Sequence, residues 1–537
     1  MRAETLPTCS CAFFAFFVVF LIPKRPCTKR PNGPPVALKV AVNAKCAICY
    51  HSLPLQRFFC MTPLPTSLLT PRPESGQARR AHLVGACGTG MRALAQLLTG
   101  FQWSVTGSDN SCFGAEPFDE PTIQIAEGHA AAHLPSDVDV LVHSPAVGTD
   151  NVEVKAAQER GVPVLSYPQM LGELMRDRHG IAVCGTHGKS TTTALCTWIL
   201  SQAGLSPSVA MGASLTWPRK SGWAGSGQLF VAEACEYRRA FLALEPETIV
   251  MLGVEPDHFD CFEDEDDQKH AFAEFADKLS HDGTLLANVD CRTTAAIAET
   301  YSGQVTRFSL SGPVGWHAQD VCPVEAGVMF RVCHGAHHHC DVLLPLFGRH
   351  HVMNALAAIA VAAELGVPAA EIEAALLTFP GLERRFEEIG TFGGVTVVDD
   401  YAHHPTAITA TIRAARQKYP RRRVCAVFEP HQYSRTTNLF DDFAQALCKA
   451  DRVIVAPIFA AREDIGVEAC DQLVSQLAEA VTAQGCPADA GSSLDRILTT
   501  LDHSLEPGDV LLTMGAGNID RIPHEFTGQF QRHSEAG

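Results

Sequence analysis

The sequence predicts an α/β protein with three domains: two outer Rossmann-like domains and a central one built on a mainly parallel sheet. The chain of 537 residues is long enough for three domains of ordinary size. From about residue 80 onward, short apolar runs of strand length alternate with stretches whose apolar residues recur at helical spacing. Polar breaks in this pattern divide the chain into predicted domains at 79–178, 179–382 and 383–537, preceded by an extension at 1–78.

Composition and charge narrow the class of protein. Hydrophobic residues make up 46% of the chain and charged residues 19%, as in globular proteins. The net charge of −17 argues against a protein that wraps nucleic acid or an anionic membrane. The 20 cysteines are scattered without a regular framework, which indicates buried thiols in a reducing, cytoplasmic compartment. Nothing in the sequence indicates an oligomeric state.

The N-terminal extension differs from the rest of the chain. Its apolar run from Cys11 to Ile22 is too short to span a bilayer comfortably, so we expect no stable membrane insertion. Cys46 and Cys49 form an isolated C-x-x-C without a second pair or a βαβ context, and we interpret the spacing as coincidental. We predict that residues 1–78 are disordered, or an upstream extension of the coding frame with Met61 as the true start.

The first predicted domain opens with a strand followed by a glycine-rich turn at 85–91 and a helix. A second strand, at 104–107, ends in Ser108 and Asp109, where Rossmann-type folds grip ribose hydroxyls. This strand–turn–helix–strand unit predicts a nucleotide ligand, with NAD as an alternative. Its glycines are spaced G-x-x-G-x-G rather than the usual G-x-G-x-x-G. Further strands are predicted at 138–143 and 162–165, and a helix at 168–178.

The central domain is organised around the stretch 181–200, in which Gly-Thr-His-Gly-Lys-Ser separates an apolar strand from a helical pattern. Glycines let backbone N–H groups turn toward an anion, and the helix N-terminus adds partial positive charge. Val183 stands where a P-loop usually has its first glycine, and Gly185 is internal instead. The flanking strand and helix still favour phosphate binding over an ordinary turn, with Lys189 reaching the terminal phosphates and Ser190 holding Mg²⁺.

Two later strands, at 229–232 and 248–254, deliver acidic and histidine side chains at their carboxyl ends. Because an α/β sheet places its functional groups at that edge, Glu233 and His258 are candidate Mg²⁺ ligands, with loop capping as the alternative. The acidic run at 263–267 is predicted to favour the N-terminus of the following helix rather than to bind metal.

Two features of the later chain draw attention. The cluster at 333–340, CHGAHHHC, lies between two strand-like stretches, so a hairpin tip is predicted rather than a zinc site. In the third domain, strands at 395–398 and 424–428 run into loops rich in histidine, aspartate, tyrosine and arginine. Such a composition is unusual for loops that only connect strands and helices, and it indicates a functional role.

Eight motifs in order resemble those of the Mur ligases, from about residue 80 to the C-terminus. They are HLVGACGTGM with GSD, GTHGKSTTT, EPDHFD, GRHHVMNALAAIA, ERRFE, DDYAHHPT, FEPHQYSRT and GAGNI. The resemblance implies a UDP-sugar domain, a P-loop ATPase domain and a third domain that closes over the amino acid. It also implies an ATP-dependent ligase reaction with Mg²⁺: the lactyl carboxylate of UDP-N-acetylmuramate is phosphorylated, and the amine of L-alanine attacks the acyl phosphate.

The resemblance further assigns roles to single residues in four groups. The catalytic group is Lys189, Tyr401, His403 and Arg435. The ATP-binding group is Gly185, Thr186, His187, Gly188, Lys189, Ser190, Thr191, His350, Asn354, Arg385 and Asp400. The UDP-sugar group is Gly85, Gly88, Thr89, Gly90, Met91, Ser108 and Asp109. The metal ligands are Ser190, Glu233 and His258. For Arg435 there is also a physical reason, since a guanidinium can hold an amino-acid carboxylate bidentately and leave the amine free.

Three positions depart from the family pattern. Cys235 replaces an aspartate, His351 an asparagine and Gln432 an arginine. The departure at Gln432 concerns how the substrate end is held, so a ligase of the same family that adds a ready-made tripeptide is the nearest alternative. From other classes, an NAD-dependent oxidoreductase and a nucleotide-binding protein without ligase activity also stay open.

Overall fold

The computed structural model describes residues 78–110, 122–461 and 463–535, all within one compact unit of the chain. The predicted N-terminal extension, with Cys46, Cys49 and Met61, lies outside the described residues up to residue 77. Every cysteine in the described part is a free thiol. Within that part, none of the helices has the length and apolar character that crossing a bilayer requires. The described strands form three sheets.

The first sheet has five parallel strands in the order β3-β2-β1-β4-β5, the arrangement of a Rossmann-type fold. Its strands are β1 (Arg80–Val84), β2 (Ser104–Asp109), β3 (Ile123–Glu127), β4 (Val140–His143) and β5 (Val164–Ser166). Its helices are α1 (Thr89–Gly100), η1 (Ala131–His133), α2 (Val152–Glu159) and α3 (Tyr167–Met175). The sequence did not predict β3 and α2.

The second sheet has ten strands in the order β15-β14-β13-β12-β11-β10-β6-β9-β7-β8. Its strands are β6 (His179–Cys184), β7 (Ser208–Ala210), β8 (Gly222–Trp223), β9 (Leu229–Glu233), β10 (Thr248–Met251), β11 (Thr284–Asn288), β12 (Gln304–Ser309), β13 (Trp316–Val324), β14 (Gly327–His334) and β15 (His337–Leu344). Its helices are α4 (Lys189–Gln202), η2 (Tyr237–Ala243), α5 (Glu265–Ala276), α6 (Arg292–Thr300), α7 (Arg349–Glu364) and α8 (Ala369–Leu377).

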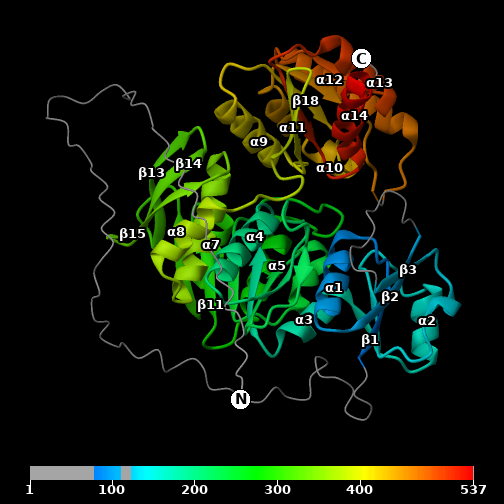
Figure 1. The fold of residues 1–537 in the computed structure, drawn as a ribbon, viewed down its shortest axis with the longest axis vertical. Helices are drawn as coiled ribbons and strands as arrows, with labels where there is room; N and C mark the ends of the chain where they lie inside the picture. Colours follow the sequence, from blue (N-terminus) through cyan, green and yellow to red (C-terminus); the bar gives the residue numbers. More distant parts are fainter. Residues whose placement is uncertain (1–77, 111–121, 462, 536–537) are drawn as a thin grey trace, which may run out of the picture. The chain divides into compact units, whose positions relative to one another are not determined.

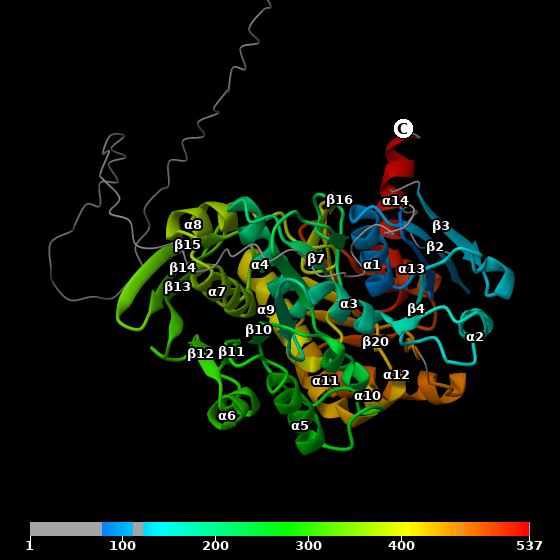
Figure 2. The ribbon, with the colours of Figure 1, turned by 90° about the horizontal axis from the view of Figure 1, so that it is seen from below.

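Seven neighbouring strands, in the sheet order β13-β12-β11-β10-β6-β9-β7, pair in parallel, which confirms the mainly parallel sheet. Helices α4 and α7 pack against each other, as Figure 2 shows, and their alanine-rich and apolar faces form one core with this sheet. The acidic run that the sequence placed at a helix N-terminus does lie there. Asp264 caps α5, and its side chain accepts a hydrogen bond from the backbone N–H of Asp267.

The two edges of the second sheet differ. Strands β13, β14 and β15 form an antiparallel extension beside α8 (Figure 1). At this edge the backbone N–H of Asp341 donates to Glu373 of α8 at 2.9 Å. The opposite edge is β8, only two residues long, which lies against α1. A Cβ at Gly222 of β8 would overlap the backbone oxygen of Ala93 in α1, so only glycine permits this approach.

The third sheet has six strands in the order β16-β17-β21-β18-β19-β20, parallel except for β16. Its strands are β16 (Glu387–Phe392), β17 (Val395–Asp400), β18 (Val424–Phe428), β19 (Arg452–Val455), β20 (Ala488–Ala490) and β21 (Val510–Met514). Its helices are α9 (Pro405–Lys418), α10 (Tyr433–Asn438), α11 (Phe440–Leu447), α12 (Val467–Ala483), α13 (Leu494–Ser504), η3 (Asn518–Asp520) and α14 (Arg521–Glu535). The predicted α/β class is thus confirmed for all three sheets.

Candidate active site

The carboxyl ends of three adjacent strands bring the central site together. Strand β6 pairs with β9 on one side and with β10 on the other, and all three run in parallel. The glycine-rich loop follows β6, Glu233 ends β9, and the segment 255–258 follows β10. Residues far apart in the chain therefore meet at one edge of the sheet, where α/β proteins bind their ligands.

The loop after β6 has the geometry of a phosphate cradle. Gly185 and Gly188 adopt φ values of +127° and +81°, which side chains rarely tolerate, and Gly188 caps α4. Lys189 folds back over the loop, and its Nζ donates to Gly185 O at 2.7 Å and Thr186 O at 3.2 Å. The glycine-rich loop and the helix start suit an anion.

A buried carboxylate accompanies Lys189. Its Nζ lies 2.9 Å from Oε2 of Glu236, a side chain with no exposed surface. Burial disfavours the charge on Lys189, but Glu236 outweighs that effect and raises the pKa of the lysine. Burial likewise opposes the charge on Glu236, yet Lys189 lowers its pKa. Both groups are therefore charged and neutralise each other before any nucleotide arrives.

The residues beside α4 fit a magnesium–nucleotide complex. Ser190 Oγ donates to Glu233 Oε2 at 2.9 Å, and the Gly212 N–H donates to the same oxygen at 2.8 Å. Hydroxyl and carboxylate oxygens are the ligands that Mg²⁺ prefers. Arg385, from the segment before β16, donates to Ser190 Oγ at 3.3 Å, and its Nε is buried without a hydrogen-bond partner. An unpaired guanidinium N–H next to a P-loop is suited to a phosphate oxygen.

The third predicted metal ligand lies apart from the other two. His258 has a positive φ of 55°, and its Nε2 lies 3.5 Å from Glu236 Oε1 rather than beside Glu233. Its ring packs edge-on against Tyr237. The structure therefore brings Ser190 and Glu233 together and places His258 against Glu236, the partner of Lys189.

Helix α7 supplies two of the predicted ATP-binding residues, His350 and Asn354. Asn354 is buried against the P-loop, where a Cβ at Gly188 would overlap its side chain. The rings of His350 and His351 lie 4.0 Å apart. Burial, followed by the charge of His187, lowers the pKa of His350 to about 4. Both ring nitrogens of His351 are buried without a partner, so the residue that replaces asparagine leaves hydrogen-bonding capacity unused.

In the third sheet, the ends of β17, β18 and β21 lie side by side. Asp400 accepts hydrogen bonds from the backbone N–H groups of Phe386 at 2.7 Å and Ala402 at 2.8 Å. It therefore holds the segment before β16 and the loop after β17 in place. Burial raises the pKa of Asp400 to about 6. The Tyr401 ring lies 4.7 Å from the guanidinium carbon of Arg385. His403 packs edge-on against that ring, and its Nδ1 lies 2.8 Å from Tyr401 O.

Arg435 is buried and already paired. Its Nε and Nη2 donate to Oδ1 of Asp257, at 2.8 and 2.7 Å, and its Nη1 donates to the backbone oxygen of His431 at 3.2 Å. Burial opposes the charge on Asp257, but Arg435 outweighs it and holds the pKa of that carboxyl far below its usual range. Gln432 is buried at the start of α10 with a φ of 71°.

The glycine-rich turn of the first sheet is held by the predicted aspartate. Asp109 Oδ2 accepts a hydrogen bond from the Cys87 N–H at 2.8 Å, and Gly85 has a φ of 78°. Gly88 caps α1, which begins at Thr89, and a Cβ at Gly90 would touch the Tyr167 ring. The Met91 side chain packs in the core, so only its backbone is available to a ligand.

Ser108, the neighbour of this aspartate, belongs to a buried network. Its Oγ donates to Oε2 of Glu153 at 2.6 Å, and His82 Nε2 lies 2.9 Å from the same oxygen. Burial opposes the charge on Glu153, but hydrogen bonds from His82, Ser108 and Ala130 lower its pKa from 4.5 to about 2. The Ser108 side chain therefore stabilises the loop rather than pointing to a ligand.

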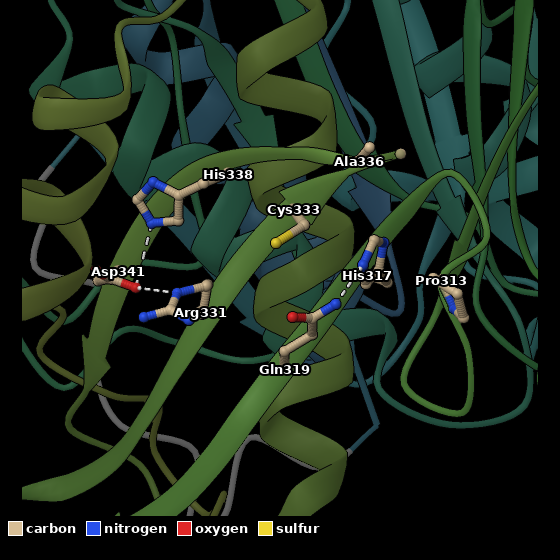
Figure 3. Close-up of a pocket in the computed structure, with 9 residues that line it drawn as sticks. Pro313, His317, Gln319, Arg331, Cys333, Ala336, His338 and Asp341 are labelled. Carbon is tan, nitrogen blue, oxygen red and sulfur yellow. Dashed lines mark hydrogen bonds and ion pairs between the residues drawn. The ribbon is translucent and has the colours of Figure 1, made fainter. Parts of the chain in front are cut away.

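The Cys/His cluster at 333–340 forms the tip of the β14–β15 hairpin, as predicted. Its outer face lines a shallow groove of about 500 Å³, drawn in Figure 3. There Asp341 pairs with both Arg331 and His338. Within the described ranges, the one group of three metal-type side chains with ligand atoms within 4.8 Å of one another lies elsewhere, at His187, Glu255 and His404.

Sequence reasoning did not pair the two cationic side chains with the buried carboxylates that hold them. Glu236 follows Glu233 by three residues just after a strand, and this position was the available signal. Asp257 was noticed at its strand end, but its partner Arg435 lies 178 residues away. No local pattern in the sequence connects them.

The site has a P-loop at the carboxyl edge of a parallel sheet, with the Ser190 hydroxyl and the Glu233 carboxylate beside it and Arg385 from the segment before β16. These features define a nucleotide-binding enzyme of the P-loop class. The matches to known proteins identify the family: the chain belongs to the Mur ligases, and the predicted resemblance is confirmed. "Mur ligase family, catalytic domain" matches residues 80–179, "Mur ligase middle domain" 183–362 and "Mur ligase, glutamate ligase domain" 384–517.

Relatives and solved structures agree with this family. UDP-N-acetylmuramate–L-alanine ligase of Desulfitobacterium hafniense is 39% identical, covering 82% of this chain and 98% of that protein. The protein of the same name from Acidithiobacillus ferrooxidans is 40% identical, covering 83% and 97%. The fold matches UDP-N-acetylmuramate-alanine ligase MurC of Thermotoga maritima with a TM-score of 0.71 at 24% identity, over 84% of this chain and 99% of that one. A murein peptide ligase of Psychrobacter arcticus matches with a TM-score of 0.64 at 27% identity, covering 84% and 99%.

Proposed function

We propose that this protein joins L-alanine to the lactyl carboxylate of UDP-N-acetylmuramate at the expense of ATP, through an acyl phosphate, in peptidoglycan precursor synthesis. The observation that carries the proposal is the P-loop site, where Lys189 folds over the loop and the next residue, Ser190, contacts both Glu233 and Arg385. The relatives that match over nearly their whole length carry the name of this reaction. A cytoplasmic location suits an enzyme that consumes ATP.

The chemistry requires positive charge at that point. A carboxylate is a poor acceptor for an amine at neutral pH until it gains a better leaving group, and phosphorylation brings two anions together. Lys189 and Arg385 offset this repulsion and stabilise the charge on the transferring oxygens. Mg²⁺, held by Ser190 and Glu233, would supply further charge neutralisation when bound. ATP binding has to draw Lys189 partly away from Glu236.

The two other substrates have assigned places in this proposal. The loop at 85–91, held by Asp109, would bind the UDP moiety through its backbone N–H groups. Arg435 would bind the carboxylate of L-alanine, which then shares the guanidinium with Asp257. Tyr401 and His403 would shape the acceptor end of the site. His258 would complete the metal site through a shift of its side chain.

A second candidate is the ligase that adds a preformed tripeptide to the same sugar nucleotide. It is favoured by the structural match to a murein peptide ligase and by Gln432, which replaces a charged residue at the substrate end. An NAD-dependent oxidoreductase is not favoured, because it leaves the P-loop and the Mur ligase matches unexplained.

Phosphate release from ATP tests the proposal. We expect release only when UDP-N-acetylmuramate and L-alanine are both present, with glycine, L-serine and the tripeptide turned over more slowly. Preference for the tripeptide would support the second candidate instead. Release that needs neither substrate would contradict the ligase proposal altogether.

A further inference from the structure

Three metal-type side chains from distant segments meet next to the P-loop. His187 belongs to the loop itself, Glu255 follows β10, and His404 immediately precedes α9. One ligand atom of each lies within 4.8 Å of the other two. His187 Nε2 lies 3.3 Å from Glu255 Oε2, and the two imidazole rings are 4.7 Å apart.

The electrostatics of this cluster favour a cation between the three groups. His404 Nδ1 accepts a hydrogen bond from the Thr406 N–H at 3.3 Å, so the lone pair of the neutral ring lies on Nδ1. The same nitrogen faces Glu255 Oε2 at 3.9 Å. The Nδ1 lone pair is occupied by the Thr406 N–H, so an ion that binds there replaces this long hydrogen bond, and the Glu255 carboxylate beside it attracts positive charge. Burial, followed by the charge of His187, lowers the pKa of His404 to about 4, so this ring carries no cation at neutral pH.

We propose that His187, Glu255 and His404 form a binding site for a divalent transition metal of the Zn²⁺ class, distinct from the Mg²⁺ site of the ligase reaction. Zn²⁺ binds imidazole nitrogen and carboxylate oxygen at about 2.0–2.2 Å, which places tetrahedral ligands about 3.3 Å apart. The His187–Glu255 distance of 3.3 Å, which a hydrogen bond holds in the absence of an ion, already has that value, and a bound ion would replace the proton between the two atoms. The longer distances to His404 shorten by side-chain rotation, and water would complete the fourth position.

The ligand set selects the metal. Two imidazoles and one carboxylate suit Zn²⁺, Co²⁺ or Fe²⁺, whereas Mg²⁺ prefers an octahedron of oxygens. Thr406 supports the set from outside, because its hydroxyl donates to Glu255 Oε2 at 2.7 Å. Hydrogen bonds of this kind orient a metal ligand and raise metal affinity. A bound ion would join the P-loop to the start of α9, so it would also protect the protein against thermal unfolding.

Cobalt provides a direct test that needs neither nucleotide nor turnover. We would titrate Co²⁺ into the purified full-length protein and follow the visible absorption that tetrahedral Co²⁺ shows with nitrogen ligands. We expect one equivalent to bind, to be displaced by Zn²⁺, and to resist a large excess of Mg²⁺. The melting temperature should rise with Zn²⁺ but not with Mg²⁺.

Variants identify the ligands. His404→Ala and His187→Gln should each weaken Co²⁺ binding by more than about 100-fold, because each removes a ligand, and Thr406→Val by about 10–100-fold. His187 is partly exposed, so His187→Gln keeps the test valid if His404→Ala does not fold. Circular dichroism checks the fold of each variant.

Matched controls cover the other groups that could take up the ion. His258→Ala tests the Mg²⁺ site, His338→Ala the hairpin tip, and Cys46→Ser with Cys49→Ser the N-terminal C-x-x-C. All should bind Co²⁺ like the wild type. The proposal is overturned if no ion binds, if His404→Ala and His187→Gln bind normally, or if a control variant loses the ion. Because binding is read without ATP, these outcomes are independent of whether the ligase proposal holds.

Discussion

Replacing Lys189 should have two separable effects, on stability and on turnover. The Lys189 side chain is 13% exposed and its partner Glu236 is fully buried, with 2.9 Å between Nζ and Oε2. Removing one partner of a buried ion pair leaves an uncompensated charge and costs about 3–5 kcal/mol. Lys189→Ala should lower the free energy of unfolding by about that amount. The double variant Lys189→Ala/Glu236→Gln removes both charges and should regain most of it.

Turnover should behave differently. The double variant restores a neutral core but supplies no positive charge to the phosphates. We therefore expect both variants to lose at least about 10²–10³-fold in phosphate release, the usual effect of removing one stabilising group from a transition state. Urea unfolding followed by circular dichroism measures stability, and phosphate release with both substrates measures turnover. Lys278→Ala, an exposed lysine just after α5, serves as the control and should change neither.

Two results would refute this reasoning. If the double variant regained both stability and turnover, Lys189 would serve only to neutralise Glu236, and the P-loop assignment would be wrong. If Lys189→Ala were as stable as the wild type, the variant would hold no uncompensated charge at Glu236, and the buried ion pair would contribute nothing to stability.

Other variants test the remaining contacts. Asp257→Asn leaves the buried cation of Arg435 unpaired and should lower the free energy of unfolding by about 3–5 kcal/mol in urea titrations. Glu153 has a folded-state pKa of about 2 against an ordinary 4.5, so the unfolded chain takes up its proton first as the pH falls. Its contribution of about 3 kcal/mol is present above pH 4.5 and lost toward pH 2, and Glu153→Gln should abolish that slope in acid unfolding curves. Gly188→Ala forces a side chain into a φ of +81° against Asn354, at roughly 1–2 kcal/mol, and should weaken ATP binding about tenfold in calorimetry.

Each of these expectations has a contrary outcome. Unchanged urea stability of Asp257→Asn would mean that the arginine finds another partner. An acid unfolding curve of Glu153→Gln that keeps the wild-type slope would assign the pH dependence to other carboxylates. Normal ATP affinity of Gly188→Ala would show that the nucleotide does not approach this part of the backbone.

The sequence predicted best what is encoded locally. The strand, the glycine-rich loop and helix α4 are adjacent in the chain, and both loop glycines adopt the positive φ values that glycine permits. The hairpin at 333–340 was likewise predictable from two strand-like runs around a short turn. Strand β3 and helix α2 escaped notice because β3 is half exposed and α2 has only eight residues.

Side-chain partners across the fold could not be predicted in the same way. Arg384 and Arg385 are neighbours in the sequence, yet Arg384 binds Asp399 within its own sheet while Arg385 reaches Ser190. The sequence Arg384-Arg385 does not indicate which of the two side chains binds which partner. His258 follows the expected strand but faces Glu236 because its backbone has a positive φ. Such orientations depend on tertiary packing, which no residue spacing encodes.

Both edge strands of the ten-stranded sheet carry a feature that hinders pairing with a further strand. On one side, β8 offers only two residues and lies directly against α1. On the other, a backbone donor of β15 at Asp341 is already satisfied by Glu373. Exposed strand edges are the usual route by which β-containing proteins associate through their backbones. The Asp341 N–H is therefore unavailable to a further strand, and Glu373→Ala would be the simplest way to release it.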